Sequence, residues 1–179
     1  MTKNILKYLS VAIIAVAASS CAKEEIGGTA VQDMCGEWYI LVDGVDADGN
    51  VVYEDPLDLG YTSAYTYNTN ANLSTEMYLE DYAWEFFIKV DVDYPNRTFS
   101  VKDAVMYYDE DENGDVFPVL VNILNGKVVK DGALSAAGYV TDGISYLIQA
   151  EDDPYAAAGY WDYLWVHGYR RTGLMGGND

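Results

Sequence analysis

Basic residues are scarce in this chain of 179 residues. Ten Lys and Arg stand against 29 Asp and Glu, which gives a formal net charge of −19. Binding a nucleic-acid backbone requires clustered Lys and Arg that displace its counterions. An anionic bilayer surface repels an acidic domain, because the two carry charge of the same sign. The composition therefore argues against nucleic acid as a partner and against adsorption of the folded domain on an anionic membrane.

Histidine and cysteine are also rare, with one His and two Cys in the whole chain. A zinc cluster, a paired-histidine site or a disulfide framework needs more of these residues than are available. We therefore expect no metal centre of this kind and no cofactor. Apolar residues, in contrast, are plentiful: half of the chain is hydrophobic, with 17 Tyr and 4 Trp. This length and composition suit one domain with an ordinary core, and we expect a monomer.

The N-terminus has the pattern of an export signal. Lys3 and Lys7 precede an uncharged, mostly apolar run over residues 8–18, which is too short to span a bilayer core that needs about 20 helical residues. Ala18-Ser19-Ser20-Cys21 resembles the lipobox of bacterial lipoproteins, and this resemblance implies cleavage before Cys21 and lipidation of that residue. The alternative is a secreted protein without an anchor. Lys23-Glu24-Glu25 resembles export signals of Bacteroidetes surface lipoproteins, so the expected location is the bacterial outer membrane, with the protein lipid-anchored and surface-exposed.

The expected organisation follows from this signal. We predict a signal peptide over 1–20, a flexible tether over 21–35, a β-barrel domain over 36–175 and a disordered tail over 176–179. Acylation of Cys21 would leave Cys35 without a disulfide partner. We therefore interpret Cys35 as a small apolar residue at the start of the fold, although a thiol nucleophile activated by His167 is the alternative reading.

Beyond residue 36 the pattern is that of β-strands. Over 84–93, apolar residues alternate with largely polar ones, which is typical of a half-buried antiparallel strand. Asn125-Gly126 is a strong two-residue turn signal and predicts a hairpin between 116–124 and 127–130. Other strands are predicted within 38–42, 51–53, 61–67, 99–107, 144–148 and 160–170. About eight short strands without helical periodicity favour an all-β antiparallel barrel or sandwich.

Two resemblances favour the barrel. Gly36-Glu37-Trp38 resembles the Gly-x-Trp signature of calycin and lipocalin-like barrels, in which the tryptophan plugs one end and an arginine of the closing strand lies over it; here that arginine is Arg170 or Arg171. The order of several short motifs is similar to that in the Bacteroidetes lipoprotein family described as lipid-binding putative hydrolases. These motifs are Tyr67-Asn68-Thr69, the Trp84 strand, Asn125-Gly126-Lys127, Asp142-Gly143-Ile144 and Arg170-Arg171-Thr172-Gly173.

The resemblance implies an envelope lipoprotein that binds a small hydrophobic, lipid-like ligand. Closed barrels of about eight strands either fill with side chains or hold one small ligand. If the inward side chains line a cavity, apolar burial would favour such a ligand at about 25 cal/mol per Å². The predicted ligand-lining residues are Trp38, Trp84, Phe86, Ile88, Tyr146 and Ile148.

Aromatic residues of the last strand support an alternative function. Trp161, Tyr163, Trp165 and Tyr169 fall on one side of the predicted strand, while Leu164 and Val166 fall on the other. An exposed row of such rings would be a platform on which sugar rings stack, as in an accessory glycan-binding lipoprotein. The structural alternative is that the four rings pack against another part of the chain.

Evidence for an enzyme is weaker. A Gly-x-Ser-x-Gly nucleophile motif does not occur, and His167 is the only imidazole. Among 29 acids a catalytic carboxylate pair stays open, because only the separation of two carboxyl groups in space identifies one. We name no catalytic residue and favour a binding protein over a hydrolase. The family pattern has Asp-Ser where this chain has Asp142-Gly143, which argues against a serine-dependent role at that position.

One acidic segment resembles a calcium loop. Residues 109–114 read Asp-Glu-Asp-Glu-Asn-Gly, like the beginning of such a loop, but its twelfth position is Leu120 instead of the chelating glutamate. The flanking residues also favour strands over helices. We therefore predict that Asp109 to Asp115 form a plain acidic hairpin turn without metal.

Overall fold

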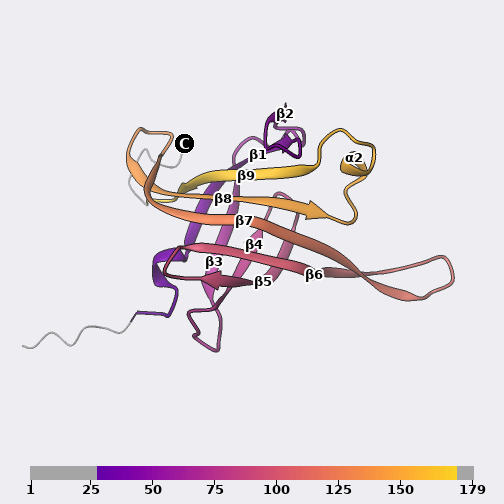
Figure 1. Ribbon diagram of the computed structural model, residues 1–179, viewed down its shortest axis with the longest axis horizontal. Helices are drawn as coiled ribbons and strands as arrows, with labels where there is room; N and C mark the ends of the chain where they lie inside the picture. Colours follow the sequence, from indigo (N-terminus) through magenta and orange to yellow (C-terminus); the bar gives the residue numbers. More distant parts are fainter. Residues whose placement is uncertain (1–27, 173–179) are drawn as a thin grey trace, which may run out of the picture.

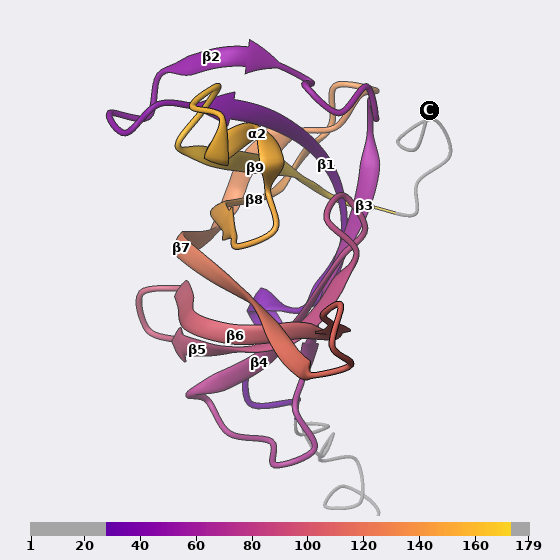
Figure 2. The ribbon, with the colours of Figure 1, turned by 90° about the vertical axis from the view of Figure 1, so that its right-hand side faces the viewer.

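The computed structural model describes residues 28–172 and forms one antiparallel sheet that closes on itself (Figures 1 and 2). Neighbours in the sheet follow chain order from β3 to β9, and β1 pairs with both β3 and β9. The barrel strands are β1 (Gly36–Val45), β3 (Thr62–Asn68), β4 (Glu76–Asp81), β5 (Phe86–Asp93), β6 (Thr98–Glu110), β7 (Val116–Leu134), β8 (Val140–Ala150) and β9 (Tyr163–Arg170). The closed eight-stranded barrel confirms the predicted all-β, calycin-like fold.

Three short elements complete the described chain. Strand β2 (Val51–Glu54) pairs only with the end of β1. The 3-10 turn η1 (Gln32–Met34) precedes β1, and one helical turn, α2 (Pro154–Ala157), lies between β8 and β9. Within residues 28–172, none of the helices has the length and apolar character needed to cross a membrane.

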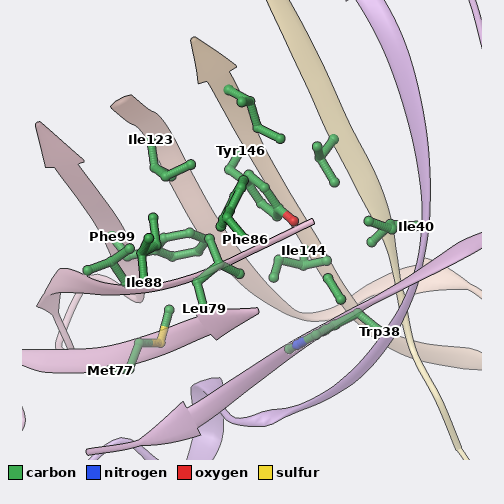
Figure 3. Packing of buried hydrophobic residues seen from close by; sticks show 14 of the residues in the cluster. Trp38, Ile40, Met77, Leu79, Phe86, Ile88, Phe99, Ile123, Ile144 and Tyr146 are labelled. Carbon is green, nitrogen blue, oxygen red and sulfur yellow. The ribbon is translucent and has the colours of Figure 1, made fainter. Parts of the chain in front are cut away.

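Side chains alternate along the strands between the interior and the outer face, and the inward ones fill the interior. Strand β5 shows it most clearly, because every second residue from Phe86 to Val92 is buried and those between them are exposed. The interior side chains pack against one another in a single cluster (Figure 3). Ile40, Leu79 and Ile123 expose 0% of their surface, so no water-sized space remains beside these side chains.

The residues before β1 plug one end of the barrel. Val31 and Met34 are fully buried, and Thr66 joins them to the wall. The Thr66 hydroxyl donates a hydrogen bond of 2.6 Å to the Met34 carbonyl oxygen and accepts one of 2.9 Å from Trp38 Nε1. Residues 28–35, which the sequence predicted to be part of the tether, are thus folded onto the barrel. The remainder of that segment, the signal peptide, Cys21 and the predicted tail lie outside the described residues.

The arginine that covers this plug is Arg170. Its guanidinium carbon lies 4.8 Å from the centre of the Trp38 ring. Arg170 Nη2 donates to the Asp33 carbonyl oxygen at 2.7 Å and lies 3.3 Å from a carboxylate oxygen of Asp142. Arg171 instead lies over Tyr39 and pairs with Glu37. The two arginines that the sequence left as alternatives therefore have different partners.

Two predicted local features are wrong. Asn125-Gly126 is not a hairpin turn: β7 continues through it as a bulge, with Asn125 at φ 53° and a register shift between Leu124 and Lys127. Gly126 is needed there, because a Cβ at this position would lie 2.4 Å from the Phe99 ring. The sequence also missed β4 and placed Trp84 in a strand, whereas Trp84 lies in the turn between β4 and β5.

The acidic segment is a hairpin turn at the tip of β6 and β7, which extends well beyond the barrel in Figure 1. Asp111 organises it by accepting hydrogen bonds from the backbone N–H groups of Asn113, at 2.8 Å, and Asp115, at 3.0 Å. These hydrogen bonds lower the pKa of the Asp111 carboxyl group. Across residues 28–172 the structure contains no group of three or more His, Cys, Asp or Glu placed to hold a metal ion.

One buried polar pair crosses the apolar interior. The Tyr146 hydroxyl donates to Asp81 Oδ2, while Asp81 Oδ1 accepts from the backbone N–H groups of Ala83 and Trp84, each at 2.8 Å. Both residues of the pair are 1% exposed. Burial raises the pKa of the Asp81 carboxyl group despite these hydrogen bonds, and it also raises the pKa of Tyr146. The pair anchors the β4–β5 turn to β8 on the far side of the interior.

Replacing each arginine in turn tests which of the two stabilises the plugged end of the barrel. We expect Arg170→Met to lower the free energy of unfolding by about 2 kcal/mol, because it removes the stack on Trp38 and a charged hydrogen bond. Arg171→Met, the matched control, removes an exposed ion pair and will cost much less, because such pairs contribute little to stability. Urea denaturation followed by tryptophan fluorescence measures both. Equal losses would contradict the assignment of Arg170 to the plug.

Asp81 will make stability depend on pH. Because its folded pKa is raised, folding takes up a proton, and the favourable contribution is complete below the unfolded carboxyl pKa of about 3.9. That contribution is lost as the pH rises through the raised folded pKa. We expect the stability of the native protein relative to Asp81→Asn to fall over this window, as measured by urea denaturation at several pH values. Parallel pH profiles for the two proteins would show that the carboxyl group is not the cause.

Candidate functional site

An irregular stretch of β7 opens a pocket on the outside of the barrel. Between the pairs Val129–Gly143 and Ala133–Thr141, β7 has three residues where β8 has one. Asp131 takes up the extra length at φ 52°, and its N–H donates to Asp142 Oδ1 at 2.9 Å. Such a bulge bends its strand and interrupts the regular ladder. Here it leaves a hollow between β7 and the outer faces of β8, β9 and β1.

We call this hollow the side groove. Its volume is about 350 Å³, which lies within the usual range of about 300–1,000 Å³ for small-molecule sites. Glycines lie at its β7, β8 and β9 positions, and most of its other residues are apolar. The full lining is Leu41, Tyr61, Val129, Gly132, Ala133, Leu134, Gly143, Ile144, Ser145, His167, Gly168 and Tyr169.

The walls of the side groove are apolar and accessible. On the β7 side, Leu134 is 64% exposed and Val129 is 40% exposed. On the other side, Tyr61 reaches in from the segment before β3 and lies edge-on to the Tyr169 ring, with centroids 5.7 Å apart. Apolar surface that is left open in a concave site is available for burial by a ligand.

Polar groups gather where β8, β9 and β1 cross the side groove. His167 is the register partner of Ser145 in β8 and of Leu41 in β1. Its Nε2 lies 3.0 Å from Asp43 Oδ2, and its ring stacks on Trp165 with centroids 4.1 Å apart. Asp43 lies outside the groove lining and was not singled out from the sequence. It lies 124 positions from His167 and reaches it only because β1 and β9 pair.

The six predicted ligand-lining residues lie elsewhere. Trp38, Phe86, Ile88, Tyr146 and Ile148 belong to the packed interior and expose between 0% and 4% of their surface. Trp84 is partly buried in the β4–β5 turn, where its Nε1 donates to Asp152 Oδ1 at 3.1 Å. A ligand inside the barrel would therefore need these side chains to move apart, whereas the side groove is already open.

The predicted aromatic platform is not exposed along its whole length, because its two end residues are buried. Trp161 and Tyr169 are only 6% and 5% exposed. Tyr53, Tyr155 and Tyr160 surround Trp161, whose Nε1 donates to Asp153 Oδ2 at 2.8 Å. Tyr163 and Trp165 are partly buried, and Trp165 is stacked on His167. The four residues therefore do not form a continuous exposed surface for sugar rings.

A different part of the barrel presents aromatic rings outward. On β3, β4 and β5, Tyr78 stacks on Phe87 with centroids 4.8 Å apart, and Tyr65 lies parallel to Tyr67. Glu80 accepts hydrogen bonds from the hydroxyls of Tyr67 and Tyr82. The alternating pattern of these strands puts the rings on the solvent side, where they cover the barrel wall.

Cys35 does not have the surroundings of a nucleophile. Burial raises the pKa of its thiol, although the nearby Arg170 acts in the opposite direction. A reactive cysteine needs its pKa lowered. Since His167 lies on the outer face between Ser145 and Leu41, and Cys35 directly precedes β1 at the plugged end, the structure does not place the thiol beside the imidazole.

A larger pocket of about 760 Å³ lies where β5, β6 and the first β7 bulge meet. Six of its ten lining residues carry polar or charged side chains, among them Asp91, Asp93 and Lys127, whereas none of the described residues that line the side groove carries a carboxylate or ammonium group. The full lining is Asp91, Val92, Asp93, Thr98, Phe99, Ser100, Leu124, Asn125, Gly126 and Lys127. The side groove is therefore the better candidate for a lipid-like molecule.

Comparison with known proteins agrees with this chemistry. The model of a protein family described as "Lipid-binding putative hydrolase" matches residues 23–175, which include every strand of the barrel. No curated protein matches the chain. Since the match covers most of the sequence, the chain belongs to the family of lipid-binding putative hydrolases.

Proposed function

We propose that this protein is a lipid-anchored protein of the bacterial outer membrane that binds the acyl chain of a lipid-like ligand in the side groove. The observation that carries the proposal is the groove itself: an open concavity on the barrel wall with a glycine-containing floor and exposed apolar sides. Membership of a lipid-binding family supports the ligand class. The envelope location rests on the signal and lipobox pattern that ends at Cys21.

Apolar burial supplies the binding energy. Each methylene group removed from water contributes about 0.8 kcal/mol, and the loss of translational and conformational freedom offsets part of this gain. Val129 and Leu134 on one side and Tyr61 on the other provide exposed surface for such burial. An acyl chain lying between them would cover apolar groups that are exposed to solvent in the free protein.

The polar part of the ligand is expected to be uncharged or zwitterionic. The chain carries a net charge of −19, which disfavours an anionic head group. Ser145 and His167 at the groove offer hydrogen-bonding groups for a hydroxyl or an ester. We therefore favour a neutral ester or alcohol over a free fatty acid.

Binding inside the barrel is the alternative position. It would use Trp38, Ile88 and the other interior residues, and the ligand would have to displace a packed core. Tight packing makes such displacement costly. A substitution on the outer wall should weaken binding if the ligand lies in the side groove and leave it unchanged if the ligand lies inside the barrel, so experiment can separate the two positions.

Two substitutions at similarly exposed positions test the groove. We expect Leu134→Gln to weaken binding of cis-parinaric acid methyl ester at least about tenfold, because it replaces an apolar wall with an amide that must lose water. Val116→Gln on the distant β6–β7 hairpin is the control, since Val116 is 67% and Leu134 is 64% exposed. Ligand fluorescence measures both affinities. Equal affinities, with binding retained, would contradict binding in the side groove.

The anchor is tested with the two cysteines. We expect Cys21→Ser to abolish incorporation of a labelled fatty acid and to release the protein from the membrane fraction, because one thiol carries the acyl groups. Cys35→Ser is the matched control and will retain both. Labelling and fractionation of bacteria expressing the full chain provide the measurement. Label retained in Cys21→Ser would refute acylation at that residue.

A further inference from the structure

Three side chains with the chemistry of an acyl-transfer site lie together, two of them in the side groove and the third, Asp43, beside it. Ser145, His167 and Asp43 belong to the adjacent strands β8, β9 and β1, in that spatial order. Nucleophilic catalysis by serine needs a hydroxyl, a neighbouring base and a third group that orients the base. The sequence offered no residue for the third role, but the pairing of β1 with β9 supplies Asp43.

The imidazole is held on two sides. Asp43 Oδ2 lies 3.0 Å from His167 Nε2, and Asp43 Oδ1 accepts a hydrogen bond of 3.0 Å from the Asp55 backbone N–H. The Trp165 ring stacks on the imidazole at 4.1 Å with an interplanar angle of 22°. A carboxylate accepts hydrogen bonds, so Nε2 of the neutral ring carries the proton. This tautomer leaves the lone pair on Nδ1, which has no hydrogen-bond partner within residues 28–172.

The serine lies on the strand next to that base, and no hydrogen bond joins the two side chains in this structure. Ser145 is the register partner of His167, and opposed residues in antiparallel strands have Cβ atoms about 4.5–5.5 Å apart on the same face. Both residues line the side groove. Across the described part of the chain, the Ser145 hydroxyl makes no hydrogen bond, so no other residue holds it. Catalytic hydrogen bonds are often looser in the absence of substrate.

We infer that Ser145 is the nucleophile of an esterase site for acyl esters whose acyl chain lies in the side groove, with His167 as general base and Asp43 as a positioning residue. This inference rests on the proposed binding of an acyl chain in that groove. The apolar walls select the acyl part, and the position of Ser145 among the lining residues sets where the ester carbonyl must lie.

The reaction needs only water as a second substrate. His167 Nδ1 takes the Ser145 hydroxyl proton as Oγ attacks the carbonyl carbon, and the bond to the alcohol oxygen then breaks as His167 returns the proton to the leaving alcohol. Water next gives a proton to His167 and adds its oxygen to the acyl carbon. The bond from that carbon to Ser145 Oγ then breaks, and His167 reprotonates the serine. The products are one alcohol and one carboxylic acid.

A covalent probe tests the nucleophile directly. The full chain carrying Cys21→Ser is treated with an alkyl fluorophosphonate and analysed by intact-mass and peptide mass spectrometry. We expect one phosphonyl group on Ser145, none on Ser145→Ala, and unchanged labelling of Ser100→Ala, in which an exposed strand serine is replaced. Absence of label from the unsubstituted Ser145, or the same labelling of Ser145→Ala, would overturn the inference.

Turnover of a p-nitrophenyl acyl ester separates the roles. We expect kcat/KM to fall at least about 100-fold in Ser145→Ala and in His167→Gln. For Asp43→Asn we expect kcat to fall with little change in KM, whereas a purely structural role would not alter kcat selectively. If the parinaric ester binds normally but labelling and turnover are absent, the esterase inference fails and the binding function stands. If that ester does not bind and Leu134→Gln has no effect on labelling or turnover, the groove proposal fails as well.

Discussion

The structure depends on the pairing of its first and last strands. Eight residues of β1, from Trp38 to Val45, pair with β9 from Arg170 back to Tyr163. This ladder closes the sheet, sets Arg170 over Trp38 at the plugged end and brings Asp43 to His167. Without closure, both edges of the sheet would expose unpaired backbone groups. The same contacts that remove these edges therefore also bring Asp43 to His167 beside the side groove.

The second constraint is the filling of the barrel. Interior residues such as Ile40, Leu79 and Ile123 leave no exposed surface inside, and the buried Asp81–Tyr146 hydrogen bond ties opposite walls together. A ligand at the position of these side chains would have to displace them. Open apolar surface lies instead on the outside, where the β7 bulge at 130–132 interrupts the regular pairing with β8. There the regular wall becomes a concave surface.

The sequence correctly predicted features that depend on short-range patterns, such as which side chains of a strand face the core. The alternation from Phe86 to Asp93 identified the buried face of β5, because every second side chain there enters the core. The Gly-x-Trp motif indicated an arginine over Trp38, and pairing of β1 with β9 selects Arg170 over Arg171. Strand β4 was missed because its inward positions include the charged Asp81, which is satisfied only by distant Tyr146 and by the following turn.

The features that the sequence did not predict depend on the pairing of strands that are far apart in the chain. Asn125-Gly126 has the local preference of a hairpin turn, but β6 and β8 pair with β7 on both sides and continue it as a bulge. The His167–Asp43 contact joins residues 124 positions apart, and no spacing rule connects them. The side groove likewise combines residues of β1, β7, β8 and β9 with Tyr61. Such a site becomes visible only when the barrel is closed.

The central claim is that the outer wall, and not the interior, receives an acyl chain. Titration of the isotope-labelled protein with a medium-chain acyl ester, followed by NMR of the backbone amides, tests it most directly. The account predicts that the shifts concentrate at Gly132, Gly143 and Gly168, which lie along the side groove. Shifts concentrated instead at Leu79, Ile88 and Ile123 in the core would contradict it.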